Sequence, residues 1–137
     1  MRKRTYAREL ALQMLYQVDI THEPPEAVLN NFWQSQENPI QEQVRDFSAE
    51  IVKGVTQNLA MIDAKISEYA TNWQLKRMAV VDRNILRLSC YELIFRQDIP
   101  PKVSINEAVD LAKKYSGQEA GKFVNGVLDR IKTEGNK

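Results

Sequence analysis

The sequence predicts an all-α protein of six or seven helices, and three observations support this prediction. Apolar residues recur at helical spacing along nearly the whole chain of 137 residues. The stretches between these periodic segments are short and rich in Pro, Gly, Asn and Ser, which end helices and form loops. No segment shows the strict apolar–polar alternation of a strand. With 43% apolar and 27% charged residues, a chain of this length is expected to fold as one domain.

The first helix begins close to the N-terminus and is expected to end near residue 22. Pro24 and Pro25 cannot continue it, whereas Pro25 is well placed to open a short second helix, because proline is tolerated in a first turn. The apolar stripe of the first helix is formed by Ala7, Leu10, Ala11, Met14, Leu15 and Val18.

The middle of the chain predicts two more helices. Asn38 followed by Pro39 resembles an N-cap and first helical residue, so a third helix is expected to start there. Gly54 and Asn58 permit a bend or a break. A fourth helical stretch then reaches about Tyr69.

The second half contains the most apolar helix, predicted over about 80–96 after a connector at 71–77. A helix that is apolar nearly all round usually lies at the centre of a fold. Ser104 and Glu107 have the spacing of a capping box, which would open the next helix. Gly117 is expected to end that helix with a left-handed turn.

The last helix is predicted from about residue 118 to residue 132, and residues 133–137 are expected to form a loose tail. Asn125 and Gly126 lie in its middle, although glycine in a helix costs about 1 kcal/mol relative to alanine. We expect Gly126 to allow a neighbouring helix to approach closely, and Asn125 to form a hydrogen bond to the 104–107 turn.

Charge is distributed unevenly along the chain. Of its 19 basic residues, four lie among residues 1–8, which leaves 15 against 18 acidic residues in the remainder. A basic N-terminal arm on a slightly acidic body suits a polyanion such as nucleic acid. A frayed and solvated terminus is the alternative interpretation. The basic residues of this arm are Arg2, Lys3, Arg4 and Arg8.

Catalysis has little support in the residues. The only histidine, His22, lies in a predicted loop, and the only cysteine, Cys90, lies in the most apolar helix, where a thiol is normally inert. No glycine-rich phosphate loop and no Cys/His metal spacing is present. Since no signal peptide, membrane span or internal disulfide is expected, the sequence favours a cytoplasmic protein without membrane contact.

Four segments in fixed order and spacing resemble the NusB family of transcription antitermination factors. No single segment is specific enough to identify the family, but their order is. The segments are ARELALQMLYQVD (7–19), AVVDRNILRLSCYELIF (79–95), IPPKVSINEAVDLAKKYS (99–116) and GKFVNGVLDRI (121–131).

The resemblance implies a single RNA-binding domain over residues 1–137, built from two packed three-helix bundles. Members bind the boxA element of nascent ribosomal RNA leaders together with NusE, a ribosomal small-subunit protein. The pair joins the antitermination complex on elongating RNA polymerase with other Nus factors. The resemblance implies neither a catalysed reaction nor a cofactor.

The resemblance also implies roles for particular residues. Thr5 and Tyr6 interrupt what is often a continuous arginine cluster, so phosphate contacts are expected to be fewer or shifted. The positions matching NusE contacts are Tyr16 and Asp82. The positions matching the RNA-binding surface are Arg2, Lys3, Arg4, Arg8, Glu119, Lys122 and Phe123.

Two alternatives remain open at the level of sequence. NusB-like folds also occur as N-terminal domains of ribosomal RNA methyltransferases, so a detached RNA-binding module of such an enzyme is the first alternative. Its 137 residues leave no room for a methyl-donor-binding α/β domain. The other alternative is a homodimer in which the RNA surface is occluded.

Overall fold

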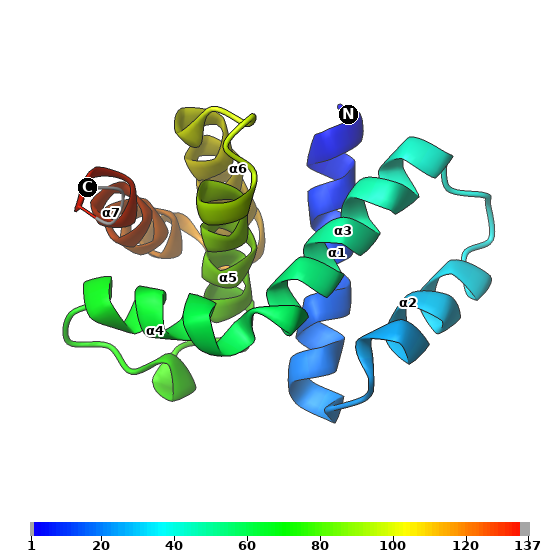
Figure 1. Cartoon of the computed structure of the whole chain (residues 1–137), viewed down its shortest axis with the longest axis horizontal. Coiled ribbons are helices and arrows are strands. Elements are labelled where there is room, and N and C mark those ends of the chain that lie inside the picture. The colour runs from blue at the N-terminus through cyan, green and yellow to red at the C-terminus, as the bar shows by residue number, and fades with distance from the viewer. Residues whose placement is uncertain (1, 135–137) are drawn as a thin grey trace.

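The computed structural model describes residues 2–134, which form seven α-helices, one short 3-10 helix and no strand (Figure 1). The all-α prediction is therefore confirmed for this part of the chain. The elements are α1 (Lys3–Thr21), α2 (Pro25–Gln34), α3 (Glu42–Gln57), α4 (Leu59–Tyr69), η1 (Leu75–Arg77), α5 (Val80–Phe95), α6 (Pro101–Tyr115) and α7 (Gln118–Glu134).

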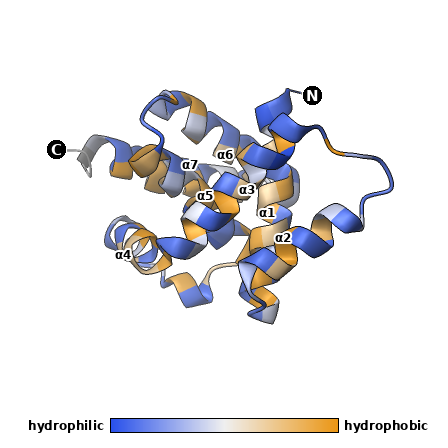
Figure 2. Cartoon of the chain, turned by 45° about the vertical axis from the view of Figure 1, so that its right-hand side comes forward, coloured by the Kyte–Doolittle hydropathy of each residue, from blue (hydrophilic) through white to orange (hydrophobic). Residues whose placement is uncertain are grey.

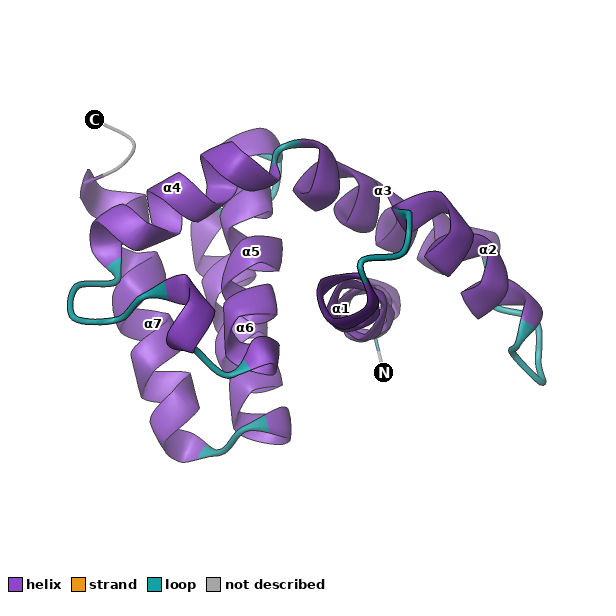
Figure 3. Ribbon diagram, turned by 90° about the horizontal axis from the view of Figure 1, so that it is seen from below, coloured by secondary structure: helices purple, strands orange, loops and turns teal. Residues whose placement is uncertain are grey.

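The helices pack in two groups, α1–α3 and α4–α7. In the second group α5, α6 and α7 form a three-helix bundle, and α4 packs across α5 and α7 (Figures 1 and 3). Helix α5 contacts α1, α3, α4, α6 and α7, so the most apolar predicted helix is the central one. Its side chains Ile85, Leu86 and Leu88 are almost completely buried.

The helices are amphipathic, as the striped colouring of Figure 2 shows. Apolar residues from all seven helices meet in one core, which joins the two groups. Its largest apolar side chains with 0% exposure are Met14, Ile51, Ile62, Ile66, Ile85, Leu86 and Leu128. The core therefore fixes how α1 lies against α5 and α6.

Two predicted helix starts are wrong. Helix α3 begins at Glu42 rather than at Pro39, with Gln41 in the N-cap position. Helix α6 begins at Pro101, so Ser104 lies inside the helix and forms no capping box with Glu107. The Ser104 hydroxyl is buried and donates a hydrogen bond to Glu92 of α5 (2.8 Å), because the side chain faces the core. By contrast Gly117, at φ 103°, ends α6 as predicted.

The two ends of the chain are more helical than predicted. The basic arm is not separate from the fold, because helix α1 already begins at Lys3. Helix α7 continues to Glu134, so the first two residues of the predicted loose tail are helical. The rest of that tail, residues 135–137, lies outside the described residues.

A charged cluster centred on Asp19 ties α1 to α5. Arg83 donates two hydrogen bonds to the Asp19 carboxylate (2.7 and 3.0 Å), and Asn84 and Arg87 each donate one more (2.9 Å). Arg87 also pairs with Asp63 of α4 through two bonds of 2.8 and 2.9 Å. Burial raises the pKa of Asp19, but the donors and positive charges outweigh it and hold that pKa below the usual 3.8.

Asp19→Asn is expected to lower the free energy of unfolding by about 2 kcal/mol at pH 7, since charge-assisted hydrogen bonds are lost. The folded-state pKa of Asp19 lies below its unfolded value of 3.8. Its contribution is therefore present above that value and is lost as pH falls through the folded-state pKa. In urea unfolding from pH 7 to pH 3, the difference in free energy of unfolding between Asp19→Asn and the wild type should become smaller below about pH 4. Asp110→Asn, at an exposed position, is the control and should match the wild type throughout.

Close packing of helices occurs at Gly54 and not, as predicted, at Gly126. A Cβ atom on Gly54 would lie 2.1 Å from Cε1 of Tyr91, so only glycine lets α3 approach α5 here. The Tyr91 ring is held by stacking on Phe95 and by a 3.0 Å hydrogen bond from its hydroxyl to Glu50. A Cβ atom on Gly126 would meet nothing within 4 Å. Asn125 beside it is exposed, and no hydrogen bond of its side chain to residues 104–107 is found.

The two glycines predict opposite effects of the same substitution. Gly54→Ala is expected to lower the free energy of unfolding by about 2 kcal/mol, because the methyl group displaces the Tyr91 ring. Gly126→Ala should raise it by about 0.5 to 1 kcal/mol, since alanine is the better helix former at an open position. Thermal and urea unfolding of both variants would check this pair. A stabilised Gly54→Ala protein would contradict the packing described above.

Candidate nucleic-acid interface

The start of α1 presents three exposed cations, Arg2, Lys3 and Arg4. The ammonium of Lys3 donates to the Gln43 side chain (2.9 Å), and the Arg4 guanidinium lies 4.7 Å from the centre of the Phe47 ring. Both contacts leave donors free for a phosphate. These three residues therefore lie where a polyanion can reach them.

Thr5 and Tyr6 interrupt the cationic run for a structural reason. Both are partly buried, and the Thr5 hydroxyl donates a 2.6 Å hydrogen bond to Glu107 of α6. Tyr6 packs against the hydrophobic core. These two positions thus face the body of the protein, while Arg2, Lys3 and Arg4 face solvent.

Arg8 has a different environment from the other predicted RNA-binding residues. Its side chain is 2% exposed and forms a bidentate pair with Glu92, both N···O distances being 2.7 Å. A third nitrogen, Nη1, lies 3.3 Å from Glu107. Since both carboxylates already satisfy the guanidinium, a phosphate contact by Arg8 does not fit this position. Arg8 instead joins α1 to α5 and α6.

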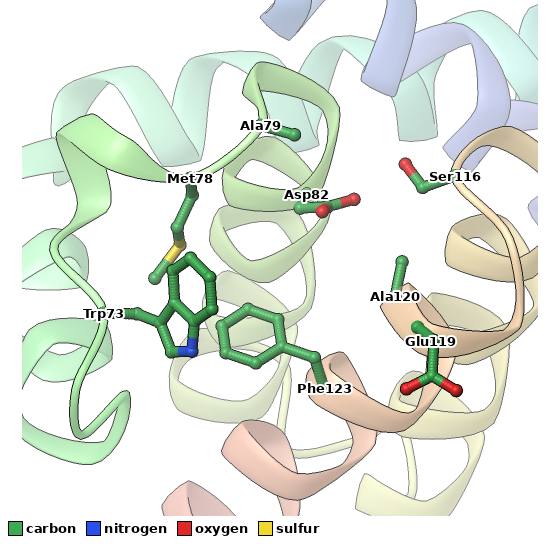
Figure 4. A pocket seen from close by; sticks show the side chains of 8 residues that line it. All are labelled: Trp73, Met78, Ala79, Asp82, Ser116, Glu119, Ala120 and Phe123. Carbon is green, nitrogen blue, oxygen red and sulfur yellow. The ribbon is translucent and has the colours of Figure 1, made fainter.

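The predicted residues from the second half of the chain gather at an open groove of about 540 Å³ (Figure 4). The groove lies between the 70–79 connector, the start of α5, and the turn from α6 into α7. Its lining residues are Trp73, Met78, Ala79, Asp82, Ser116, Glu119, Ala120 and Phe123. The structure thus brings Asp82, predicted to contact NusE, together with Glu119 and Phe123, predicted to contact RNA.

Aromatic surface and acidic oxygens meet in this groove. The Trp73 and Phe123 rings pack edge to face with centroids 5.8 Å apart, and Trp73 remains 55% exposed. Oxygen Oδ1 of Asp82 is buried and receives no hydrogen bond from the described residues. Lys122 lies at the rim beside Phe123, 75% exposed and 3.6 Å from the Glu119 carboxylate.

The groove and the cationic start of α1 lie at opposite ends of α5. Helices α1 and α5 run antiparallel, because Arg8 pairs with Glu92 while Asp19 pairs with Arg83. Helix α5 has 16 residues and is therefore about 24 Å long. A single ligand that reaches both regions must span roughly 20 Å. Tyr16 lies on α1, towards the end of that helix, and is 43% exposed.

The described residues contain no cluster for a metal ion, and their one thiol is buried. Residues 2–134 contain no group of three His, Cys, Asp or Glu side chains placed to hold a metal ion. Burial raises the pKa of the Cys90 thiol to about 12, which keeps it protonated and unreactive at neutral pH. His22 is exposed at the end of α1. No helix within the described part of the chain is long and apolar enough to cross a membrane.

Comparison with known proteins decides the family. The model of the NusB family matches residues 5–133. The chain belongs to the NusB family. A transcription antitermination protein NusB from Anaeromyxobacter dehalogenans (strain 2CP-1 / ATCC BAA-258) is 50% identical over 129 residues, which are 94% of this chain and 89% of the relative.

Solved NusB structures share the fold. NusB from T. maritima is 40% identical and superposes with a TM-score of 0.86, over 96% of this chain and 91% of the other. A chain from the crystal structure of antitermination factors NusB and NusE in complex with dsRNA gives a TM-score of 0.87 at 33% identity, over 96% and 97% of the two chains. The all-α fold with its helix order is therefore that of NusB.

Trp73 lies in the connector predicted at 71–77, where the sequence alone does not mark it as part of a binding surface. The structure leaves the residue 55% exposed and makes its side chain one wall of the groove. A tryptophan in a loop is a weak signal, because periodicity does not reveal which helix it faces. Pairing with Phe123 becomes visible only once α7 lies beside the connector.

Proposed function

We propose that this chain is a transcription antitermination factor. In this proposal it binds the boxA element of nascent ribosomal RNA leaders together with NusE and joins the other Nus factors on elongating RNA polymerase. The observation that carries the proposal is the family match over residues 5–133, together with the close similarity to a NusB chain from a complex of NusB, NusE and dsRNA. The chain acts in the cytoplasm as a binding protein, without catalysis or a cofactor.

The charge distribution supports RNA as the ligand. Arg2, Lys3 and Arg4 are exposed at one end of the interface, and Lys122 is exposed at the other. Exposed cations of this kind bind phosphates and make the affinity depend on salt. Phe123 and Trp73 offer aromatic surface on which unpaired bases stack. An extended single strand matches the separation between the two regions better than a compact ligand does.

Tyr16 is the residue we propose for the NusE contact. The residue is 43% exposed on α1, and an exposed tyrosine is a common anchor in protein interfaces. NusE is a ribosomal protein, and the acidic excess beyond residue 8 suits a basic partner.

The proposal is tested by titrating labelled single-stranded boxA RNA with the protein, with and without NusE, at 50 and 200 mM salt. We expect binding that weakens at the higher salt concentration and tightens when NusE is added. A scrambled RNA of equal length is the control. Equal affinity for both RNAs in every condition would refute the proposal. Light scattering at several protein concentrations, with and without RNA, tests whether a homodimer occludes the surface.

A further inference from the structure

The first turn of α1 has the composition of a helix end that should fray. Arg2 is the N-cap residue, and a guanidinium has no acceptor atom with which to cap the free N–H groups of the turn. Lys3 and Arg4 follow, so three positive charges lie at the end of the helix where its dipole is also positive. The local sequence therefore opposes helix formation at the place where the proposed phosphate contacts begin.

The helix is nevertheless formed from Lys3 onward, and tertiary contacts explain this. From Tyr6 onward α1 rests on the core, because Tyr6 packs against it and Ala7 is completely buried. Among the described residues, three side-chain contacts hold the residues ahead of Tyr6 to neighbouring helices. They are Lys3 with Gln43 (2.9 Å), Arg4 with the Phe47 ring (4.7 Å) and Thr5 with Glu107 (2.6 Å).

The third contact differs from the other two because it uses no cation. Lys3 and Arg4 belong to the proposed RNA interface, so a bound phosphate competes with Gln43 and Phe47 for them. Thr5 is partly buried and carries no charge, and its hydroxyl donates to a residue of α6. The Thr5 contact can therefore persist while the neighbouring cations bind RNA.

Glu107 is a fixed acceptor for this hydrogen bond. Its side chain is 16% exposed, and its Oε1 atom also lies 3.3 Å from Nη1 of Arg8. Arg8 is in turn held by two hydrogen bonds of 2.7 Å to Glu92 of α5. Thr5 is thus joined through Glu107 and Arg8 to the buried centre of the protein. A hydrogen bond to a charged acceptor is also stronger than one between neutral groups.

We propose that the Thr5–Glu107 hydrogen bond is a tether that keeps the first turn of α1 helical and holds Arg2, Lys3 and Arg4 in place for RNA. This inference rests on the proposed function and adds two positioning residues to it, since Thr5 and Glu107 act through the cations. When the turn frays, the cations must be ordered again as RNA binds. The apparent affinity then falls in proportion to the fraction of molecules in which the turn is already formed.

Thr5→Val tests the tether, because valine keeps the β-branched shape of threonine, removes the hydroxyl and leaves every charge in place. Anisotropy titrations use labelled single-stranded boxA RNA with the full chain, at a fixed NusE concentration and from 50 to 300 mM salt. The affinity should be about fivefold weaker at every salt concentration. The slope of log K against log salt should stay that of the wild type, because the same phosphate contacts form once RNA is bound.

Amide hydrogen exchange, measured by NMR without RNA, gives a second readout. The Tyr6 amide donates to the Arg2 carbonyl (3.0 Å), which is the first backbone hydrogen bond of α1. Exchange of this amide should be about fivefold faster in Thr5→Val, since fraying exposes it to water. The circular dichroism spectrum should stay close to that of the wild type, because the change is confined to one turn.

Two further variants complete the design. Thr5→Ser retains a hydroxyl at the same position and should keep most of the affinity that Thr5→Val loses. Thr133→Val removes an exposed hydroxyl of α7 that donates to the Asp129 carbonyl of its own helix (2.9 Å). This matched substitution should leave both RNA affinity and the exchange of the Tyr6 amide at their wild-type values.

The outcomes separate this inference from the proposed function. Wild-type RNA affinity in Thr5→Val would overturn the tether and leave the proposed function intact, and unchanged exchange of the Tyr6 amide would do the same. A smaller salt slope in Thr5→Val would also overturn it, because phosphate contacts would then have been lost. Equal loss of affinity in Thr5→Ser and Thr5→Val would assign the effect to packing rather than to the hydroxyl. Absence of boxA binding by the wild-type protein with NusE would refute the proposed function together with the tether.

Discussion

Arg8→Met is expected to lower the free energy of unfolding by about 3 to 5 kcal/mol. The Arg8 and Glu92 side chains are 2% and 1% exposed and are joined by two hydrogen bonds of 2.7 Å. Methionine keeps most of the apolar stem but removes the charge. Among the described residues, the Ser104 hydroxyl (2.8 Å) is then the remaining hydrogen-bond donor to the buried Glu92 carboxylate. Burying a charge with so little compensation carries a severe free-energy penalty.

Urea unfolding at pH 7 measures this loss, and the double variant Arg8→Met/Glu92→Met is its control. Removing both charges leaves neither uncompensated, so the double variant should recover much of the stability lost by the single one. RNA affinity per folded molecule should be close to wild type in the double variant, because Arg8 lies inside the protein. A stable Arg8→Met protein with weak RNA binding would instead show that Arg8 leaves the core to contact phosphate.

Replacing Arg2, Lys3 and Arg4 together by glutamine is expected to produce the largest loss of RNA affinity without unfolding. Each phosphate contact contributes about −0.7 to the slope of log K against log salt for a single strand. Three lost contacts should therefore reduce the magnitude of the slope by about 2. The loss should be similar for RNAs of different sequence, since phosphate contacts carry no sequence information.

Anisotropy titrations from 50 to 300 mM salt measure the slope for the triple variant and the wild type. Lys53→Gln/Lys65→Gln removes charge from α3 and α4 and is the control for net charge. Its slope should stay near that of the wild type, because a local contact and not net charge sets the slope. An unchanged slope in the triple variant would remove the start of α1 from the interface.

Much of the fold is determined by local sequence patterns. The helical periodicity, the prolines at 24–25 and Gly117 place most helix boundaries within a few residues of those observed. The helix starts predicted at 38–39 and at 104 are wrong. A residue whose local sequence resembles a helix cap can instead use its side chain in a tertiary contact. Ser104 is the clear case, because its hydroxyl serves Glu92 of another helix.

The candidate site could be predicted less completely, because exposure depends on which helices meet. Arg2, Lys3, Arg4 and Arg8 look alike in sequence, yet only Arg8 is buried among carboxylates of α5 and α6. The same limit applies to Gly54 and Gly126, whose neighbours are a tyrosine ring and open space.

Helical periodicity and motifs in fixed spacing are enough to identify the family, the all-α class and the order of the helices. Only the tertiary structure decided which charged residues are accessible and that Asp82, Trp73 and Phe123 share one groove. The physical reason is that these three residues come from three separate segments. The core that packs α5 against α6 and α7 brings the three residues together. The periodicity within one segment does not show which other segment it will contact.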